Sequence, residues 1–139
     1  MIRSIWYPPL GNRDMADMVY KEVFGDCEKA DELGWHVVIT APDDSPAAAG
    51  RLDYINASTG KISRVCCLPQ YRRNRMADSV VKLLIYRASL LNMKKVIAAA
   101  EGEGASLLLT MGFTQTGEYQ FEKDVCDGCC ENCKDKCPC

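Results

Sequence analysis

The sequence has no long apolar run and little imbalance of charge. None of its apolar stretches approaches the roughly 20 residues that cross a bilayer, and the formal net charge is −2. The first residues lack the basic stretch, apolar core and small-residue cleavage site of a secretion signal. These absences exclude a membrane protein and a globally basic, nucleic-acid-binding surface, and they predict a cytoplasmic protein.

Histidine is scarce, since His36 is the only one in the chain. It lies within a strand pattern, where a structural role is expected. No Ser/His/Asp or Cys/His arrangement with a supporting motif accompanies it. A hydrolytic triad is therefore not indicated.

Cysteine, by contrast, is abundant. Six of the nine cysteines fall in the last fourteen residues, "CDGCCENCKDKCPC". Cys66 and Cys67 lie in an apolar stretch, where cysteine behaves as a small hydrophobe. The length of 139 residues suits a single domain, so we expect one domain over 1–125 followed by a cysteine-rich tail over 126–139.

Hydrophobic periodicity indicates an α/β fold. Apolar residues at helical spacing predict helices over 13–24, from residue 79 to 91, and over 102–112. Runs rich in β-branched and apolar residues predict strands over 35–41, 47–55, 61–68, 94–100 and 113–123. Asp78 or Ser79 is the expected cap of the long helix. The order of these elements predicts a mixed, mostly antiparallel sheet flanked by helices.

The junction between the strand ending at Leu68 and the long helix predicts an anion site. The first turn of a helix presents unpaired backbone N–H groups that suit a phosphate. Arg72, Arg73 and Arg75 surround this turn. Three arginines in a loop are also typical of a merely solvated surface.

These segments resemble the GNAT superfamily of acetyl-CoA-dependent N-acetyltransferases over about residues 1 to 122. "RRNRMA" is similar to the Arg/Gln-x-x-Gly-x-Gly/Ala loop of the family at Arg72 and Ala77, and "MGF" resembles the family's "LGF". The resemblance implies a GNAT-like fold and direct transfer of acetyl from acetyl-CoA to a small-molecule or peptide amine. It implies these cofactor contacts: Cys67, Leu68, Arg72, Arg73, Asn74, Arg75, Met76, Ala77 and Asp78.

The chain departs from the family pattern at two positions. Arg75 stands where the family usually has a glycine that lets the backbone approach the CoA pyrophosphate. Leu108 stands where many members have a tyrosine that protonates the departing thiolate. Leucine cannot donate a proton, so Tyr119 or an ordered water is the alternative acid.

By the same resemblance, a backbone amide near Cys67 or Leu68 polarises the acetyl carbonyl. A carboxylate would help to remove the proton of the amine, and Glu101 and Glu103 follow the predicted strand over 94–100. Acidic residues just before a short helix also stabilise its N-terminus without any part in catalysis.

The tail has the spacing of a metal site. Cys126 and Cys129 form one C-x2-C pair, and Cys130 and Cys133 form a second. Three residues then separate Cys133 from Cys137. These spacings bring four thiolates within reach of one ion. Zinc is favoured over an iron–sulfur cluster, because Asn132 interrupts the cysteine run of ferredoxins; a redox-active or disulfide-tied tail is the alternative. By the resemblance, the tail begins where a final strand of the family is expected. The preferred ligands are Cys126, Cys129, Cys133 and Cys137.

Two further classes stay open beside the acetyltransferase. The departures at Arg75 and Leu108 suit a non-catalytic acyl-CoA-binding module, and the tail suits a metal-binding or redox-sensing protein on a GNAT scaffold. The sequence leaves the acceptor amine and the oligomeric state open, including a homodimer.

The cysteine spacing predicts about one zinc ion per chain under reducing conditions. Zinc affinity should fall at low pH, because the thiolate ligands become protonated. Deleting the residues after Val125 should lower the melting temperature and leave CoA affinity largely intact. Metal analysis of anaerobically purified protein checks this. Neither zinc nor iron in the sample, together with tail disulfides in mass spectrometry, would contradict it.

Overall fold

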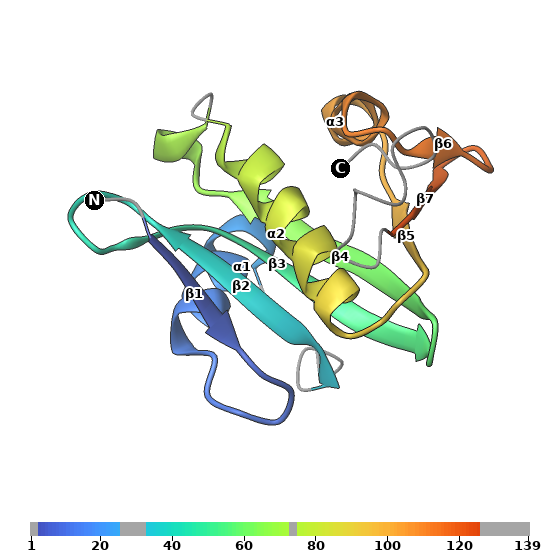
Figure 1. Cartoon of the computed structure of the whole chain (residues 1–139). Coiled ribbons are helices and arrows are strands. Elements are labelled where there is room, and N and C mark those ends of the chain that lie inside the picture. Colours follow the sequence, from blue (N-terminus) through green and yellow to red (C-terminus); the bar gives the residue numbers. More distant parts are fainter. Residues whose placement is uncertain (1–2, 26–32, 73–74, 126–139) are drawn as a thin grey trace.

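The computed structural model describes residues 3–25, 33–72 and 75–125. A seven-stranded sheet organises them, in the order β1-β2-β3-β4-β5-β7-β6 (Figure 1). Among the described strands, β4 and β5 form the one parallel pair, and the other neighbours are antiparallel. The predicted mixed, mostly antiparallel sheet is thus confirmed. The strands are β1 (Arg3–Tyr7), β2 (Trp35–Thr40), β3 (Pro46–Asn56), β4 (Thr59–Cys67), β5 (Lys95–Ala99), β6 (Thr114–Gln115) and β7 (Gln120–Asp124).

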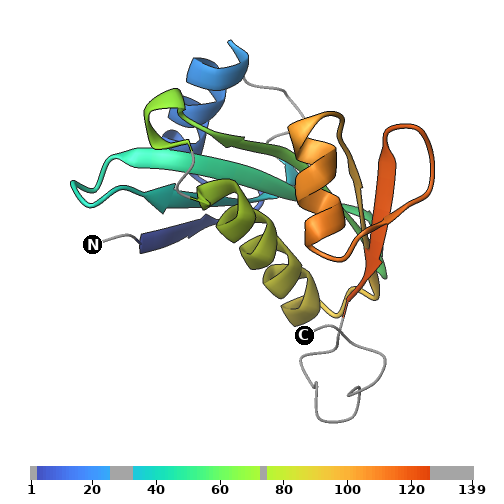
Figure 2. The ribbon, with the colours of Figure 1, turned by 90° about the horizontal axis from the view of Figure 1, so that it is seen from above.

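Helices cover both faces of the sheet. The helix α1 (Asp14–Phe24) packs on one face and α2 (Met76–Leu90) on the other (Figure 2). The helix α3 (Glu103–Thr110) shares the core of α2, and a short 3-10 turn, η2 (Pro69–Tyr71), precedes α2. No helix in the described part of the chain is long and apolar enough to cross a membrane.

The central strand β4 separates from β5 halfway along its length. The two strands pair only over Thr59–Ile62, and β4 continues to Cys67. On its other side, β4 has a β-bulge, because Gly50 of β3 faces both Arg64 and Val65. Arg64 adopts the left-handed conformation with φ 59°, and such bulges bend a strand and re-aim its side chains. The second half of β4 therefore leaves β5 and opens a gap in the sheet.

The start of α2 differs from the prediction. The helix begins at Met76 and its N-cap is Arg75, so Asp78 lies within the first turn. Ser79 donates its hydroxyl proton to the Arg75 carbonyl, which makes it part of the helix. The prediction of Asp78 or Ser79 as the cap is therefore wrong.

Two strand predictions also require correction. β1 was not predicted, because its short sequence "RSIWY" has mixed polarity and lies at the sheet edge. The single strand expected over 113–123 is a hairpin of β6 and β7 that turns at Gly117. In the described residues β7 lies between β5 and β6, and the expectation that the tail begins where a final strand belongs falls outside them.

The chain leaves the sheet at the end of β5 that is remote from the gap. Val125 is buried and donates its backbone N–H to Lys94, 2.8 Å away. The predicted metal ligands in the tail lie outside the described residues. Within 3–25, 33–72 and 75–125, no group of three metal-ligating side chains has the geometry of a metal site.

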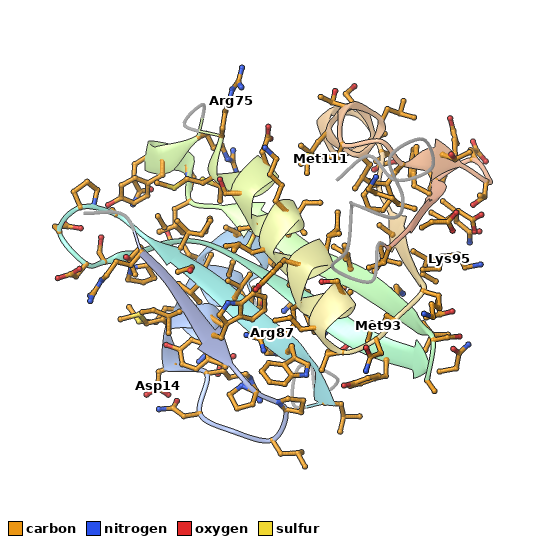
Figure 3. All side chains as sticks on the ribbon, viewed as in Figure 1. Asp14, Arg75, Arg87, Met93, Lys95 and Met111 are labelled. Carbon is orange, nitrogen blue, oxygen red and sulfur yellow. The ribbon has the colours of Figure 1, made fainter. Side chains whose placement is uncertain are left out.

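An arginine joins α2 to the sheet edge. The Arg87 guanidinium lies 4.4 Å from the ring centre of Trp6 on β1 and 4.6 Å from that of Trp35 on β2 (Figure 3). The two indole rings meet edge to face at 6.5 Å. Cation–π contacts of this kind stabilise by about 0.5–2 kcal/mol, so Arg87 helps to hold α2 against β1 and β2.

Gly50 permits the close approach of α2 to β3. A Cβ at this position would lie 2.5 Å from Val80 Cγ1 and 3.0 Å from Leu84 Cδ1. Overpacking of this kind costs about 1–3 kcal/mol, so we expect Gly50→Ala to reduce the free energy of unfolding by that amount in urea denaturation.

The matched control for Gly50→Ala is Gly117→Ala. A Cβ at residue 117 would make its nearest contact with Gln120 at 3.5 Å, which is ordinary van der Waals contact. Its effect should stay within about 0.5 kcal/mol. Equal losses in the two variants would show that the approach of α2 does not depend on Gly50.

Candidate active site

A cleft of about 1000 Å³ opens where β4 leaves β5. Its walls are the second half of β4, residues 98–100 at the end of β5, and the first turn of α2. Leu107 and Leu108 of α3 close one side, while Val23 and Phe24 at the end of α1 contribute from the opposite face of the sheet. The cleft therefore reaches from the α2 and α3 face to the α1 face.

The α2 end of the cleft has the features of an anion site. None of the described side chains caps the N-terminus of α2, so the N–H groups of its first turn remain for a ligand. Arg72 lines the cleft, and its Nε lies 3.4 Å from the Cys67 carbonyl oxygen. A phosphate at this end would meet helix N–H groups and a guanidinium together.

Arg75 retains the backbone conformation that favours glycine. Its φ is 56°, in the left-handed region, and its exposed side chain points away from the ribbon (Figure 3). An arginine at the family's glycine position is thus compatible with the same turn of the backbone, and Arg75 lines the α2 end of the cleft.

The backbone of β4 directs one amide toward the cleft. The N–H of Leu68 bonds to the Ala47 carbonyl of β3, 2.8 Å away. Adjacent residues of an extended strand present their N–H groups to opposite edges, so the Cys67 N–H points to the edge that β5 has left. Of the two predicted amide donors, this geometry favours Cys67.

The two adjacent thiols stay protonated near neutral pH. Burial raises the pKa of Cys66 to about 12. Burial also raises the pKa of Cys67, and the nearby charge of Arg72 only partly opposes this shift. Because the thiolate is the reactive form of cysteine, neither thiol is set up as a nucleophile.

The α1 end of the cleft contains residues that the sequence reasoning missed. Arg64 projects from the bulge, with its guanidinium 4.5 Å from the Phe24 ring centre and 4.9 Å from that of Tyr20. Tyr71 of η2 also lines the cleft. No local motif marks these residues, since a β-bulge depends on strand pairing and not on one segment alone.

The other predicted site residues fall in three groups. Met76, Ala77, Asp78 and Leu108 line the cleft, and Leu108 is only 4% exposed. Glu101 is exposed and Tyr119 is 50% exposed, and both lie beside the β5 wall outside the cleft lining. Arg73, Asn74 and the side chain of Glu103 lie outside the described residues.

The cleft is poor in groups that titrate near neutral pH. Among the described residues that line it, Asp78 is the single carboxylate, and there is neither a histidine nor a lysine. Asp78 belongs to the α2 end, remote from α1. General base catalysis by a described cleft-lining residue is therefore not indicated at the α1 end.

No model of a protein family and no curated protein sequence matches this chain. Solved structures do match it. A candidate N-acetyltransferase from Lactobacillus plantarum superposes with a TM-score of 0.78 and 16% identity, over 90% of this chain and 99% of that one. The chain has the GNAT fold.

Two other structures support this fold assignment. A GNAT-family acetyltransferase from Staphylococcus aureus matches with a TM-score of 0.69 and 10% identity, over 91% of this chain and 100% of that one. N-acetylglutamate synthase from Neisseria gonorrhoeae, complexed with coenzyme A and L-arginine, matches with a TM-score of 0.70 and 10% identity, over 88% of this chain and 33% of that one. The predicted GNAT-like fold is confirmed.

Replacing Arg75 by glycine should stabilise the protein. The left-handed conformation costs a residue with a side chain about 1–2 kcal/mol, and the flexibility of glycine in the unfolded chain offsets part of this gain. We expect Arg75→Gly to raise the free energy of unfolding by about 0.5–1 kcal/mol in urea denaturation.

Arg72→Gly is the matched control for Arg75→Gly, because it removes the same charge from a residue with φ −64°. It should not stabilise the protein. If the free energy of unfolding falls as much in Arg75→Gly as in Arg72→Gly, the left-handed backbone at Arg75 is not strained and the prediction is wrong.

Proposed function

We propose that this protein is an acetyl-CoA-dependent N-acetyltransferase that acts on a small-molecule or peptide amine. The observation that carries the proposal is the cleft itself, which joins an uncapped helix N-terminus to the unpaired edge of a splayed strand. A fold alone does not define an activity. This site, however, offers both a phosphate cradle and a backbone donor for a thioester.

The α2 end suits the pyrophosphate of CoA. The backbone N–H groups of Met76, Ala77 and Asp78 form the first turn of α2, and Arg72 adds a charged donor beside it. Arg73, Asn74 and Arg75 belong to the same proposed set. The fold relative from Neisseria gonorrhoeae was crystallised with coenzyme A, which supports a CoA ligand here.

The proposed reaction is a direct transfer. The lone pair of the amine attacks the thioester carbon, a C–N bond forms, and the C–S bond breaks. The nitrogen loses one proton and the CoA sulfur finally carries one, so the products are an amide and free CoA. Charge that develops on the acetyl oxygen would be stabilised by the Cys67 N–H. Positioning of amine and thioester in one cleft supplies a further part of the rate.

Proton transfer has no assigned residue in the described cleft. Leu108 lines it and cannot donate a proton. Tyr119 accepts a hydrogen bond through its carbonyl from Ala100, 2.9 Å away, and Glu101 follows in sequence. Both therefore flank the cleft wall, and their roles as acid and base stay predictions.

A non-catalytic acyl-CoA-binding module is the second candidate. It is favoured by the apolar Leu108, which is 4% exposed, at the position of the family's acid. Such a module would bind acetyl-CoA as well as an enzyme does and would release no CoA. A tail-based metal or redox role is compatible with either candidate, because Val125 leaves the sheet at the far end of β5.

The backbone donor gives a direct test of catalysis. Cys67→Pro removes the N–H and should lower kcat by about 10²–10³, the usual effect of losing an oxyanion donor. Cys67→Ala keeps the N–H and should retain kcat within about threefold, because the protonated thiol takes no part in the reaction. Release of CoA with a panel of amines, measured by chromatography, checks both variants.

Calorimetry with CoA separates binding from chemistry in these variants, and the melting temperature of each variant verifies its folding. Lack of CoA binding by the wild type at millimolar ligand would overturn the acetyltransferase. Tight CoA binding without turnover of any amine would favour the non-catalytic module. Equal loss of turnover in Cys67→Ala and Cys67→Pro would reject the amide as the donor.

A further inference from the structure

The chain at the start of β3 binds the loop that leads into α2 at two points. Before the 3-10 turn η2, the Leu68 N–H donates to the Ala47 carbonyl, 2.8 Å away. At the end of η2, the Tyr71 hydroxyl lies 3.1 Å from Ser45 Oγ. Because η2 has only three residues, these two contacts hold both of its ends. The next residue is Arg72, which lines the cleft.

The ring of Tyr71 packs against the core on both faces of the sheet. It contacts the core cluster that α2 covers and also the cluster that α1 covers. Among the described residues, no other partly buried apolar side chain packs against both clusters. Apolar packing is not directional, whereas a hydrogen bond has a preferred geometry. The contact with Ser45 therefore sets the orientation of a ring that the core holds in place.

The hydrogen bonds of Tyr71, Ser45 and Asp43 run in one direction. The Asp43 carboxylate lies 2.6 Å from Ser45 Oγ, and an ionised carboxylate can only accept a hydrogen bond. The Ser45 hydroxyl has one proton and donates it to Asp43, so its oxygen accepts from the Tyr71 hydroxyl. The bonds from the Ser45 hydroxyl and then from its backbone N–H lower the pKa of Asp43. Tyr71 thus donates into a chain that ends on a negative charge.

The turn between β2 and β3, which contains Asp43 and Ser45, is closed by its own backbone. The Ala41 N–H donates to the Ser45 carbonyl, 2.8 Å away, and the Asp44 N–H donates to the Ala41 carbonyl, 2.9 Å away. Ala41 is 1% exposed and belongs to the core. The Ser45 hydroxyl is therefore attached to a fixed part of the sheet, and it can serve as a support for η2.

The position of Arg72 depends on η2. Its backbone N–H lies 3.4 Å from the Pro69 carbonyl oxygen, and its Nε lies 3.4 Å from that of Cys67. Both distances exceed the usual range of about 2.7–3.2 Å for such bonds. Arg72 is also exposed. Because its described contacts are weak, the turn before it decides where the guanidinium lies. A donor that is already in place loses less conformational entropy when a ligand binds.

We propose that Ser45 is a positioning residue for CoA. Through the Tyr71 hydroxyl it holds η2, and with it Arg72, in the orientation in which the α2 end of the cleft binds the pyrophosphate. Asp43 contributes by fixing the direction of the Ser45 proton. The inference rests on the CoA-binding part of the proposed function, and it extends that function to a turn outside the cleft lining.

Removal of the Ser45 hydroxyl tests this directly. Ser45→Ala should raise the Kd of CoA about three- to tenfold, as expected for the loss of one hydrogen bond. Ser45→Thr retains a hydroxyl and should keep the Kd within about twofold of the wild type. Calorimetric titration of each variant with CoA measures both values. In turnover, Ser45→Ala should raise the KM of acetyl-CoA and keep kcat within about twofold, because Ser45 does not touch the reacting atoms.

Tyr71→Phe removes the other partner of the bond and retains the ring. It should raise the Kd by about the same factor, and the double variant should bind no more weakly than either single variant, because both remove one contact. Ser58→Ala is the matched control. Ser58 Oγ lies 3.1 Å from Asn56 Oδ1 in the turn between β3 and β4, outside the cleft lining. This variant should change the Kd less than about twofold.

The outcomes separate this inference from the function on which it rests. If the wild type binds no CoA, the proposed function fails and the inference fails with it. If the wild type binds CoA and the Kd of folded Ser45→Ala changes less than about twofold, only the inference is overturned. Equal losses in Ser45→Ala and Ser58→Ala would also overturn it, as would a double variant that loses the product of both single effects.

The Ser45 comparison decides even if Tyr71→Phe does not fold. Residues 42–44 beside Ser45 are exposed, and surface substitutions usually change stability by less than about 0.5 kcal/mol. The melting temperature of Ser45→Ala verifies its folding. A lower kcat with an unchanged KM of acetyl-CoA would contradict a role in positioning CoA.

Discussion

The separation of β4 from β5 is the constraint on which the rest of the site depends. A strand at the centre of a sheet normally satisfies its backbone groups on both sides. Here β4 does so with β5 only as far as Ile62, because the bulge at Arg64 bends it away. Backbone groups are then available for a ligand within the sheet, and the molecule gains a binding cleft without any additional domain.

The bulge links three features that are distant in the sequence. Gly50 provides the space opposite it and lets α2 pack closely on β3. Arg64 is turned toward α1, where Tyr20 and Phe24 support its side chain. Beyond the bulge, β4 ends at the loop that carries Arg72 and Arg75. One local irregularity thus sets the positions of both ends of the cleft.

The sequence predicted the parts of this arrangement that are local. Helical periodicity located α1 and α2, and the strand-to-helix junction with its arginines forms the α2 end of the cleft. It did not predict β1, the β6–β7 hairpin or the bulge, because each depends on pairing with a distant strand. Arg64 was missed for the same reason. The conformation of Arg75 could not be read either, since arginine is not a residue that signals a positive φ.

The contact of Arg87 with Trp6 and Trp35 has a practical consequence for spectroscopy. These are the only two tryptophans of the protein, and both rings contact the same side chain of α2. Tryptophan emission therefore reports on the docking of α2 against β1 and β2. On the opposite face, α1 packs through Tyr20 and aliphatic side chains. Because this contact involves no tryptophan, tryptophan emission does not report on it directly. Tryptophan emission can therefore follow the loosening of α2, which begins at the cleft, separately from the loosening of α1, which supports Arg64.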